Sequence, residues 1–294
     1  MSILIDGKKT AEEIRLELKA KVDLLKKEGK KVPGLVTILV GENPASQSYV
    51  NSKSKACIEI GMHSIVERLP QDLPEKKLLD LVNKYNNDDD IHGILIQLPL
   101  PEQINEQKII EAINPKKDVD GFHPANVGNL VIGNQTFFPC TPYGVLELLS
   151  RYKIPTEGKH VVVVGRSNIV GKPVANMLLQ KKTGANAVVT VCHSAAKDLS
   201  QFTKSADILV AAIGRAHFIK ADMIKEGVVV IDVGINRVED STAKKGYKLV
   251  GDVDFVEVEK KSSYITPVPG GVGPMTIAML LKNTLEAYAR ITNG

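Results

Sequence analysis

Apolar residues recur along the chain with two different spacings. Ile14, Leu18 and Val22 follow one another at intervals of four residues, which places them on one face of a helix. Short apolar runs, such as residues 35–40, have instead the length of a buried strand. Because helices and strands of this kind alternate, the sequence predicts βαβ units built around a mostly parallel sheet.

The first half of the chain divides into elements at recognisable boundary residues. Thr10 and Glu13 have the spacing of a capping box, so we expect the first helix to begin there and to end at Gly29. Asn43 and Pro74 are typical of helix starts. The strands expected in this half are residues 35–40, 63–69 and 91–98, and the helices after them begin near residues 43, 74 and 104.

The second half follows an irregular connection, residues 114–141, that is rich in glycine and proline turn signals. A helix is expected over residues 143–152, and a Pro/Gly-rich loop, residues 267–274, leads into a last helix over 275–291. Between them we expect strands at 160–164, 187–191, 208–212 and 228–233, with helices after Gly171, Asp198 and Lys220. This series predicts a doubly wound, dinucleotide-binding fold.

Length and composition agree with a globular protein of about two domains. The 294 residues are 43% hydrophobic and 24% charged, so the chain can bury a core and is not expected to be disordered. A net charge of +4 is too small to indicate a nucleic-acid partner. The apolar runs are too short for a membrane span, and the first residues lack the pattern of a secretory signal.

The cysteines favour a reducing compartment. Cys57, Cys140 and Cys192 are an odd number, lie far apart, and include no C-x-x-C pair. This arrangement argues against a disulfide framework and against a zinc site, so we expect no metal. The sequence therefore predicts a cytoplasmic protein.

A candidate dinucleotide site lies in residues 161–171, where an apolar run is followed by a glycine-bearing turn and a helix start. Unpaired N–H groups at a helix start favour an anion such as a pyrophosphate. Ser167 stands where the second glycine of the usual G-x-G-x-x-G pattern would be, so a plain strand–helix turn remains the alternative. A serine-hydrolase elbow is excluded, because it would need glycine at Ile169.

The next strand carries the signal for cofactor choice. Enzymes that bind NAD commonly have an acidic residue at this strand end to hold the ribose hydroxyl. No acidic residue follows Val191 directly, and Asp198 lies a helical turn further on. Ser194 could donate to a 2′-phosphate and Arg166 could supply a cation, so the pattern favours NADP. Ser194 could also be the N-cap of a helix.

Candidate substrate residues lie in the first half. Tyr49 and Lys53 are four residues apart, so they share one helix face. Gln97 lies at the carboxyl end of an expected strand, the end where α/β sheets bind ligands. Asp118 and Asp120 flank a turn. Each signal alone has a structural explanation: the pair on the helix could lie on the surface, Gln97 could cap a strand end, and the aspartates could form a turn. Their joint occurrence is what favours a site.

Eight longer blocks of sequence carry a resemblance to a known family. The blocks are Tyr49-Val-Asn-Ser-Lys53, Gly93-Ile-Leu-Ile-Gln97-Leu-Pro-Leu-Pro101, Lys117-Asp-Val-Asp120-Gly121, Pro139-Cys-Thr-Pro142, Val164-Gly-Arg-Ser167 with Val170-Gly171, Cys192-His-Ser194, Asp232-Val-Gly-Ile235-Asn236, and Pro267-Val-Pro-Gly-Gly-Val-Gly-Pro-Met-Thr276. Over essentially its whole length, the chain resembles the bifunctional methylenetetrahydrofolate dehydrogenase/methenyltetrahydrofolate cyclohydrolase family.

The resemblance implies two consecutive reactions in one-carbon metabolism, which feeds purine biosynthesis. NADP⁺ takes a hydride from 5,10-methylenetetrahydrofolate, and water then opens the resulting methenyl cation to 10-formyltetrahydrofolate. The expected ligands are therefore NADP and tetrahydrofolate derivatives. The resemblance also implies a homodimer. The small net charge and the short apolar runs predict neither a nucleic-acid nor a membrane partner.

The resemblance assigns roles to residues in the matching blocks. Lys53 is expected to be the principal catalytic group of hydrolysis, and Gln97 is expected to position it. Tyr49 is expected to orient the folate, and Asp120 to accept hydrogen bonds from the pterin; these four are the expected catalytic residues. Further substrate-binding residues are expected to be Leu98, Pro269, Gly270, Gly271, Val272 and Gly273. The expected cofactor-binding residues are Gly165, Arg166, Ser167, Ser194, Ile235 and Thr276.

The fold class that follows is α/β, with two α/β domains and a cleft between them, the second domain being a Rossmann-like doubly wound parallel sheet. Residues 1–120, completed by a C-terminal helix over 270–294, would form the folate-binding catalytic domain, and residues 140–266 the NADP-binding domain. One alternative is a single-activity dehydrogenase that has lost hydrolysis or uses NAD. The retained Lys53 and Gln97 argue against lost hydrolysis, and the absence of an acidic residue after Val191 argues against NAD. Another alternative is a nucleotide-binding sensor without turnover, in which the set of Tyr49, Lys53, Gln97 and Asp120 would not be expected.

Overall fold

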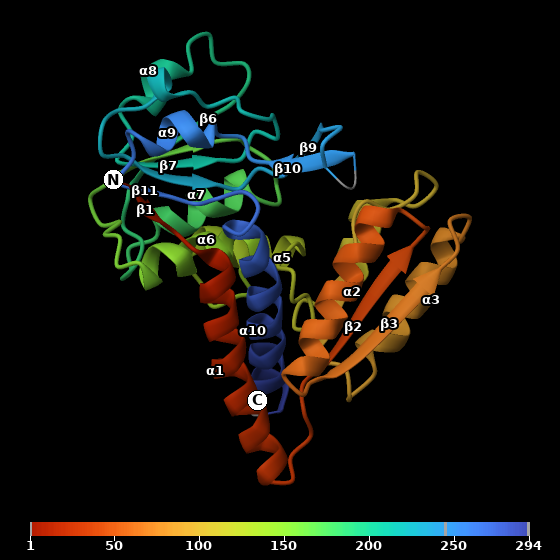
Figure 1. Cartoon of the computed structure of the whole chain (residues 1–294). Helices are drawn as coiled ribbons and strands as arrows, with labels where there is room; N and C mark the ends of the chain where they lie inside the picture. The colour runs from red at the N-terminus through yellow and green to blue at the C-terminus, as the bar shows by residue number, and fades with distance from the viewer. Residues whose placement is uncertain (1, 244–245, 293–294) are drawn as a thin grey trace. The chain divides into compact units, whose positions relative to one another are not determined.

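The computed structural model describes residues 2–243 and 246–292, and the chain falls into two compact units (Figure 1). The three-stranded unit comprises Glu12–Cys140 and the chain from Ile277 onward. The six-stranded unit comprises the chain up to Ala11 and Thr141–Thr276. Helices α1 (Gly7–Lys27) and α10 (Val272–Thr292) each begin in the six-stranded unit and continue into the other.

The three-stranded unit is built on a parallel sheet with the strand order β3-β2-β4. Its strands are β2 (Gly34–Val40), β3 (His63–Leu69) and β4 (Gly93–Ile96). Every residue of the central strand β2 is buried, because both of its faces are covered. Figure 1 shows helices α2 (Pro44–Glu59) and α3 (Glu75–Asn86) on opposite sides of these strands. Val36 and Ile38 of β2 share a core with Leu78 of α3.

The start of α2 follows the sequence signal. Asn43 is its N-cap, and the Asn43 side chain accepts hydrogen bonds from the backbone N–H groups of Ala45 (3.0 Å) and Ser46 (3.2 Å). Pro44 occupies the first helical position, where its missing N–H costs no hydrogen bond. The amide groups at this end are therefore satisfied locally, so the start of α2 could be predicted from four residues.

The predicted capping box of the first helix is wrong. Helix α1 begins at Gly7, and Asp6 is the residue that caps it, because Asp6 Oδ1 accepts the Lys9 N–H at 2.9 Å. Thr10 lies within the first turn and donates its hydroxyl to the Asp6 carbonyl at 2.9 Å. A Cβ on Gly7 would lie 1.9 Å from the Gly271 carbonyl oxygen. The close approach of these two backbones, which is a tertiary contact, therefore fixes the start of α1.

The connection expected to be irregular contains a helix. Helix α5 (Pro124–Ile132) begins after His123, whose Nδ1 accepts the Ala125 N–H at 3.0 Å. It ends at Gly133, which has a left-handed φ of 80°. Pro124 at the first helical position and Gly133 after the last are both ordinary helix boundaries. In the sequence, the same two residues also have the character of turn residues, which is why a helix is not predicted there. The preceding helix, α4, spans Glu106–Ala112.

The six-stranded unit contains one fully parallel sheet with the strand order β1-β11-β8-β7-β5-β6. The strands are β1 (Ile3–Leu4), β5 (His160–Val164), β6 (Val188–Cys192), β7 (Ile208–Ala211), β8 (Val229–Asp232) and β11 (Tyr264–Ile265). If the strands are numbered along the chain from β5, so that β5 is first and β11 is fifth, their order across the sheet from the β6 edge is 2-1-3-4-5. That is a doubly wound order, which confirms the predicted fold class.

The other helices and strands of this unit lie between or after the strands of the sheet. They are α6 (Cys140–Arg151), α7 (Gly171–Leu179), α8 (Ser200–Thr203), the 3₁₀ turn η1 (Ala221–Met223), α9 (Phe255–Glu259) and the antiparallel pair β9 (Asn236–Glu239) and β10 (Tyr247–Val250). The helices expected after Asp198 and Lys220 are thus reduced to a four-residue helix and a 3₁₀ turn. The expected last helix begins at Val272 instead of residue 275.

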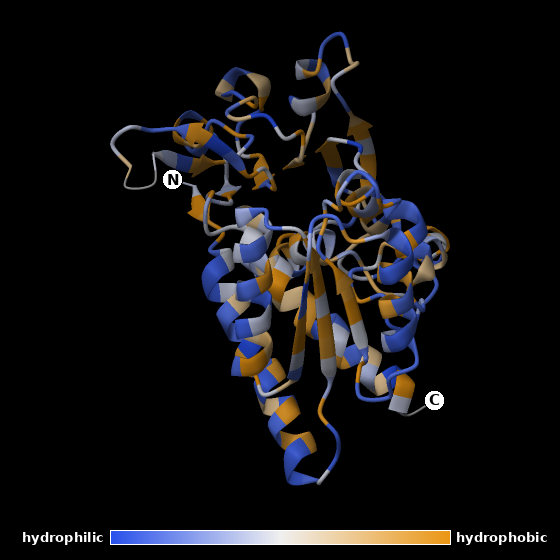
Figure 2. Cartoon of the chain, turned by 90° about the vertical axis from the view of Figure 1, so that its right-hand side faces the viewer, coloured by the Kyte–Doolittle hydropathy of each residue, from blue (hydrophilic) through white to orange (hydrophobic). Residues whose placement is uncertain are grey.

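Hydropathy follows this architecture. In Figure 2 the strands of the three-stranded sheet are largely hydrophobic, and the helices alternate between hydrophilic and hydrophobic residues. This is the pattern of helices that cover a sheet with one face and meet water with the other. Within residues 2–243 and 246–292, no helix combines the length and the apolar character needed to cross a membrane.

Candidate active site

The first candidate site is organised by Lys53 and Gln97, which lie side by side in the three-stranded unit. Lys53 belongs to α2, is only 7% exposed, and donates from Nζ to Gln97 Oε1 at 3.0 Å. Gln97 directly follows β4, and its backbone N–H continues the sheet by donating to the Ile38 carbonyl at 2.9 Å. Its side-chain Nε2 donates to the Leu98 carbonyl at 2.9 Å, so the amide oxygen faces the ammonium. The lysine is therefore held at the carboxyl end of a strand.

Tyr49 lies one helical turn before Lys53 on α2. Its side chain is 42% exposed, although it precedes a buried lysine on the same helix. An exposed aromatic ring offers a flat apolar surface to a ligand. Tyr49 therefore presents an exposed aromatic ring one helical turn before the buried Lys53.

Asp118 stabilises the turn that carries Asp120. The Asp118 carboxylate is buried and accepts hydrogen bonds from the Phe122 N–H (3.3 Å), the His123 N–H (2.8 Å) and Asn126 Nδ2 (2.8 Å). Burial nevertheless raises the pKa of the Asp118 carboxyl above its usual range. Asp118 therefore has a structural role in the turn, whereas Asp120 is half-buried.

Gly121 fixes the path of the chain after Asp120. Its φ is 72°, and a Cβ would lie 2.8 Å from the Pro139 nitrogen and 2.9 Å from the Phe137 carbonyl oxygen. Both the left-handed conformation and the close approach require glycine. The backbone directly after Asp120 is consequently packed against the segment 137–139.

Two residues outside the predicted set hold the peptide group before Asp120. Asn283 of α10 donates to the carbonyls of Val119 (2.8 Å) and Phe138 (2.9 Å), and Cys140 Sγ donates to the Val119 carbonyl at 3.4 Å. The Cys140 thiol is wholly buried. Its pKa is well above the usual range, first because of burial and then because of Asp120, while Lys53 acts in the opposite direction. Because Asp120 and Lys53 both act on the Cys140 thiol, the three residues lie in one neighbourhood.

Asn283 gave no signal in the sequence, because its role depends on a contact between distant segments. Cys140 lies in the Pro139–Pro142 block that carried the resemblance, so it could have been included among the candidates.

The second candidate site is the turn between β5 and α7. A Cβ on Gly165 would lie 2.1 Å from the Ala212 carbonyl oxygen, and a Cβ on Gly171 would lie 2.2 Å from the Gly165 carbonyl oxygen. The turn is therefore so tight that only glycine fits at either position. Such packing brings the start of a helix close to a strand end, which is the arrangement that receives a dinucleotide pyrophosphate.

Ser167 replaces the second glycine of the usual pattern and caps the helix start. Its Oγ accepts hydrogen bonds from the N–H groups of Val170 (3.1 Å) and Gly171 (3.4 Å). Arg166, next to it, is exposed. The turn thus combines a capped helix start with an exposed guanidinium at the carboxyl end of β5.

Ser194 lies at the corresponding end of the neighbouring strand β6 and is exposed. Helix α8 begins only at Ser200, with Leu199 as its N-cap, so the alternative of Ser194 as a helix N-cap is wrong. Asp198 is engaged by the Ser200 N–H, which donates to its Oδ1 at 2.9 Å. Parallel strands β5 and β6 end at the same edge, and this edge therefore presents Arg166 and Ser194 with no acidic residue directly after β6.

The other predicted ligand contacts of the six-stranded unit lie around the start of α10. Ile235 follows β8, is 47% exposed, and has its Cδ1 3.6 Å from where a Cβ on Gly273 would lie. Thr276 shares a 3.0 Å hydrogen bond with Thr141. Pro269, Gly270 and Gly271 lie before the helix, whereas Val272 and Gly273 belong to its first turn. Gly270 has a φ of 107°, a conformation that favours glycine.

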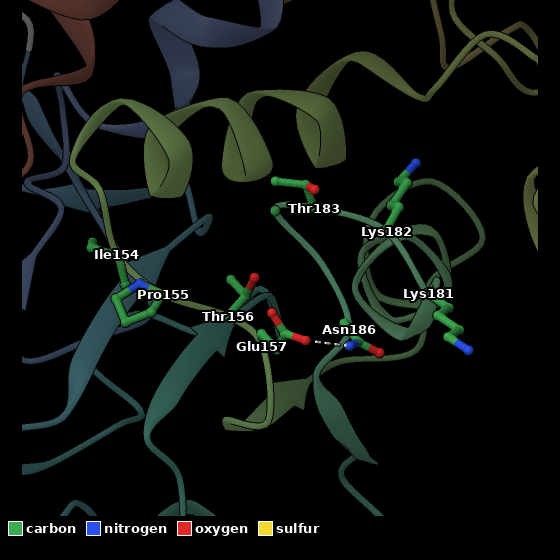
Figure 3. Close-up of a pocket in the computed structure, with 9 residues that line it drawn as sticks. Ile154, Pro155, Thr156, Glu157, Lys181, Lys182, Thr183 and Asn186 are labelled. Atoms are coloured by element: carbon green, nitrogen blue, oxygen red, sulfur yellow. Dashed lines mark hydrogen bonds between the residues drawn. The ribbon is translucent and has the colours of Figure 1, made fainter.

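A hollow shown in Figure 3 lies away from all of these residues. It is lined by Ile154, Pro155, Thr156, Glu157, Lys181, Lys182, Thr183, Gly184 and Asn186. Asn186 Nδ2 donates to Glu157 Oε1 at 2.9 Å across it. These segments precede β5 and β6, so the hollow is at the amino end of the strands, opposite the end where doubly wound sheets bind cofactors.

Metal ligation gives no further candidate in the described parts of the chain, where no three His, Cys, Asp or Glu side chains converge. Cys57, Cys140 and Cys192 are all buried free thiols.

Comparison with known proteins gives one consistent result. Residues 5–120 match the catalytic-domain model of tetrahydrofolate dehydrogenase/cyclohydrolase, and residues 139–292 match the model of its NAD(P)-binding domain. The bifunctional protein FolD of Chlorobium chlorochromatii is 60% identical over 294 residues, which are 99% of each chain.

Solved structures agree with this match. The structure of the bifunctional FolD enzyme from Campylobacter jejuni is 53% identical, with a TM-score of 0.93 over 99% of this chain and 100% of that one. The enzyme from Trypanosoma brucei, solved with NADP and an inhibitor, is 40% identical, with a TM-score of 0.94 over 100% and 99% of the two chains. The chain belongs to the tetrahydrofolate dehydrogenase/cyclohydrolase family.

Proposed function

We propose that the two reactions of this bifunctional enzyme depend on separate groups of residues. The chain is a methylenetetrahydrofolate dehydrogenase that uses NADP and a methenyltetrahydrofolate cyclohydrolase. The three-stranded unit, with α10, would bind the folate and supply the acid–base chemistry, and the six-stranded unit would bind NADP. The observation that carries this proposal is the buried Lys53 ammonium, held 3.0 Å from Gln97 Oε1 in the neighbourhood of Asp120.

For the dehydrogenase reaction, the contribution of the chain is placement. When NADP⁺ is bound, it accepts the hydride that leaves the methylene carbon of the folate. Gly165 and Gly171 would allow the pyrophosphate to approach the backbone at the start of α7. Arg166 and Ser194 would bind the 2′-phosphate by charge-assisted and neutral hydrogen bonds. Holding two carbons in reactive geometry can account for much of the rate without a further catalytic side chain.

For the cyclohydrolase reaction, Lys53 would manage the protons. Water adds to the methenyl carbon, and the oxygen must lose protons while one ring nitrogen gains a proton as its C–N bond breaks. One proton is released overall. Lys53 Nζ is the group placed to transfer these protons, and Gln97 fixes the position of Nζ. Neither residue needs NADP for this step.

Asp120 and Tyr49 would hold the folate. The Asp120 carboxylate can accept two N–H bonds from the pterin side by side, which a neutral side chain cannot do. Tyr49 would stack on the aromatic part of the folate, and Leu98 would line the pocket beside Gln97. The loop and first turn that contain Pro269, Gly270, Gly271, Val272 and Gly273 would complete substrate binding.

We also infer that the protein forms a homodimer through the edge strand β6. This strand is last in the order of the six-stranded sheet, and its Val188 and Val191 side chains are 61% and 42% exposed. An apolar edge strand is unfavourable in water, and pairing with a second copy would cover it. Three buried free thiols are consistent with a reducing cytoplasm as the location.

The experiment that tests the division of roles replaces Lys53 and compares both activities. Lys53→Met should reduce cyclohydrolase activity by about 10²–10⁴-fold, the usual loss for one positioned acid–base group, and should leave the binding of methylenetetrahydrofolate measurable. Lys55→Met is a matched control, since Lys55 is on the same helix and its side chain is 78% exposed. Near-normal hydrolysis of methenyltetrahydrofolate by purified Lys53→Met would refute the assignment.

A further inference from the structure

A second buried carboxylate lies at the carboxyl end of the six-stranded sheet. Asp252 comes just after β10 and is fully buried. Its carboxylate accepts four hydrogen bonds, from the backbone N–H groups of Ile213 (2.7 Å), Gly214 (2.8 Å) and Arg215 (2.9 Å) and from Asn236 Nδ2 (2.9 Å). Four donors saturate the lone pairs of a carboxylate. Asp252 therefore joins two separate segments, residues 213–215 and Asn236, through one group.

The first of these segments forms one side of the expected cofactor crevice. Residues 213–215 follow β7, which is paired with β5. Ala212, just before them, donates its N–H to the Val164 carbonyl at 2.8 Å, and its own carbonyl occupies the space where a Cβ on Gly165 would lie. Strands β6 and β7 flank β5 on opposite sides, so the crevice of this fold opens at the ends of β5 and β7.

The second segment carries a predicted cofactor residue. Asn236 directly follows Ile235, one of the residues expected to contact NADP. Because Asn236 Nδ2 donates to Asp252 Oδ1, the position of the Ile235 backbone is linked to the same carboxylate.

Asp252 is itself fixed by Asp232, the last residue of β8. Asp232 accepts the N–H groups of Gly234 (2.9 Å), Asp252 (3.0 Å) and Val253 (2.9 Å). A Cβ on Gly251 would lie 1.8 Å from Asp232 Oδ2, so the segment before Asp252 packs directly on this carboxylate. The Asp252 backbone thus has little freedom to move away from the loops that it holds.

We propose that Asp252 is a positioning residue for NADP, because its carboxylate holds the loops after β7 and β8 in the conformation that receives the cofactor. The proposal rests on the assignment of the six-stranded unit to NADP. Three consecutive N–H groups that point to one anion form a concave, anion-binding loop. Without the anion, residues 213–215 would populate other conformations. The apparent NADP Kd would then equal the intrinsic Kd divided by the fraction of time spent in the competent conformation.

Asp252→Asn is the variant that tests the proposal, since the amide keeps the size of the side chain and replaces one acceptor oxygen with an NH₂ group. If the loops remain competent for only a few per cent of the time, the Kd and KM for NADP rise by about 10–100-fold. The cyclohydrolase reaction, assayed with methenyltetrahydrofolate in the absence of NADP, should stay within about twofold of wild type, since it does not use this crevice. Asp254→Asn is the matched control. Asp254 is two residues away, and its carboxylate pairs with Lys220 at a partly exposed site.

The readouts separate positioning from simple destabilisation. Binding of NADP to the wild-type protein by calorimetry tests the assignment of the unit, and the variant tests Asp252. An Asp252→Asn protein with NADP Kd within twofold of wild type, or with both activities reduced in parallel, would overturn the proposal. If this variant does not fold, Asn236→Ala removes only one of the four bonds. It should raise the NADP Kd by about 3–10-fold, and an unchanged Kd would likewise overturn the proposal.

Discussion

Substitution of Gly171 by alanine should weaken NADP binding and lower stability, although alanine is the better helix former. The new Cβ would lie 2.2 Å from the Gly165 carbonyl oxygen, 2.6 Å from its carbon and 3.0 Å from the Arg166 nitrogen. All three are backbone atoms of the turn between β5 and α7, so no side chain can rotate away. Helix α7 would have to move outward by roughly 1 Å to restore ordinary contact distances, and overpacking of this kind typically costs about 1–3 kcal/mol.

Gly128→Ala provides the matched control. Gly128 lies inside α5, and apart from the backbone of its own helix and its chain neighbours, no atom of the described residues lies within 4 Å of the position that its Cβ would take. Alanine should therefore stabilise this helix by about 0.5–1 kcal/mol through its propensity alone. If alanine lowers the free energy of unfolding at position 171 and raises it at position 128, the contact with Gly165, and not helix propensity, determines the result at position 171.

The assays are thermal unfolding, calorimetry with NADP and the two activities. For Gly171→Ala we expect a lower Tm, a weaker NADP Kd and a slower dehydrogenase reaction, because the start of α7 moves away from the pyrophosphate position. Cyclohydrolase activity at a temperature well below the Tm should be retained. A Gly171→Ala protein with a raised Tm and an unchanged NADP Kd would refute this explanation of the tight turn.

Three further predictions concern other positions. Arg166→Ala should weaken NADP binding by about 10–100-fold, the loss of one charge-assisted bond, and leave NAD binding unchanged; equal use of both cofactors by the wild type would contradict it. Burial raises the pKa of Asp232 to about 7, and the nearby Asp252 carboxylate acts in the same direction. Since the unfolded pKa is near 4, the native state binds the extra proton, and this stabilisation is lost as the pH rises through 7. The free energy of unfolding of wild type minus that of Asp232→Asn, measured by denaturant unfolding, should therefore fall by about 2–3 kcal/mol between pH 5 and pH 8. A difference that does not change with pH would contradict a raised Asp232 pKa. Thr37 Oγ1 is buried and finds no hydrogen-bond partner among the described residues, so Thr37→Val should raise the free energy of unfolding by about 1 kcal/mol; a lower Tm would show that the hydroxyl is satisfied.

Elements with local signals could be predicted from the sequence. Strand β2 is a continuous apolar run buried on both faces, and α2 starts at an asparagine followed by proline, so both were located within a residue. The turn at Gly165 and Gly171 could also be predicted, because glycines at that spacing after an apolar run are typical of a turn from a strand into a helix. These features depend on residues that are close together in the sequence.

Features that depend on distant contacts could not be predicted in this way. The two residues of β1 form a strand only because they pair with β11, and α1 starts at Gly7 because Gly271 approaches it. The same limit applies to the site. Lys53, Gln97 and Asp120 are predicted from the sequence blocks that carry the family resemblance. Asn283 and Asp252, by contrast, make hydrogen bonds to segments far along the chain. No spacing in the sequence encodes such contacts.

The most direct test of the account follows one reaction mixture through both steps. The purified protein is mixed with 5,10-methylenetetrahydrofolate and NADP⁺, and the absorbance of the methenyl product and of NADPH is recorded over time. We predict that NADPH forms and that the methenyl intermediate is converted to 10-formyltetrahydrofolate faster than it hydrolyses in buffer alone. With Lys53→Met, NADPH should still form while the methenyl intermediate accumulates. Absence of NADPH, or loss of the methenyl signal by the wild type at only the rate in buffer, would contradict the account.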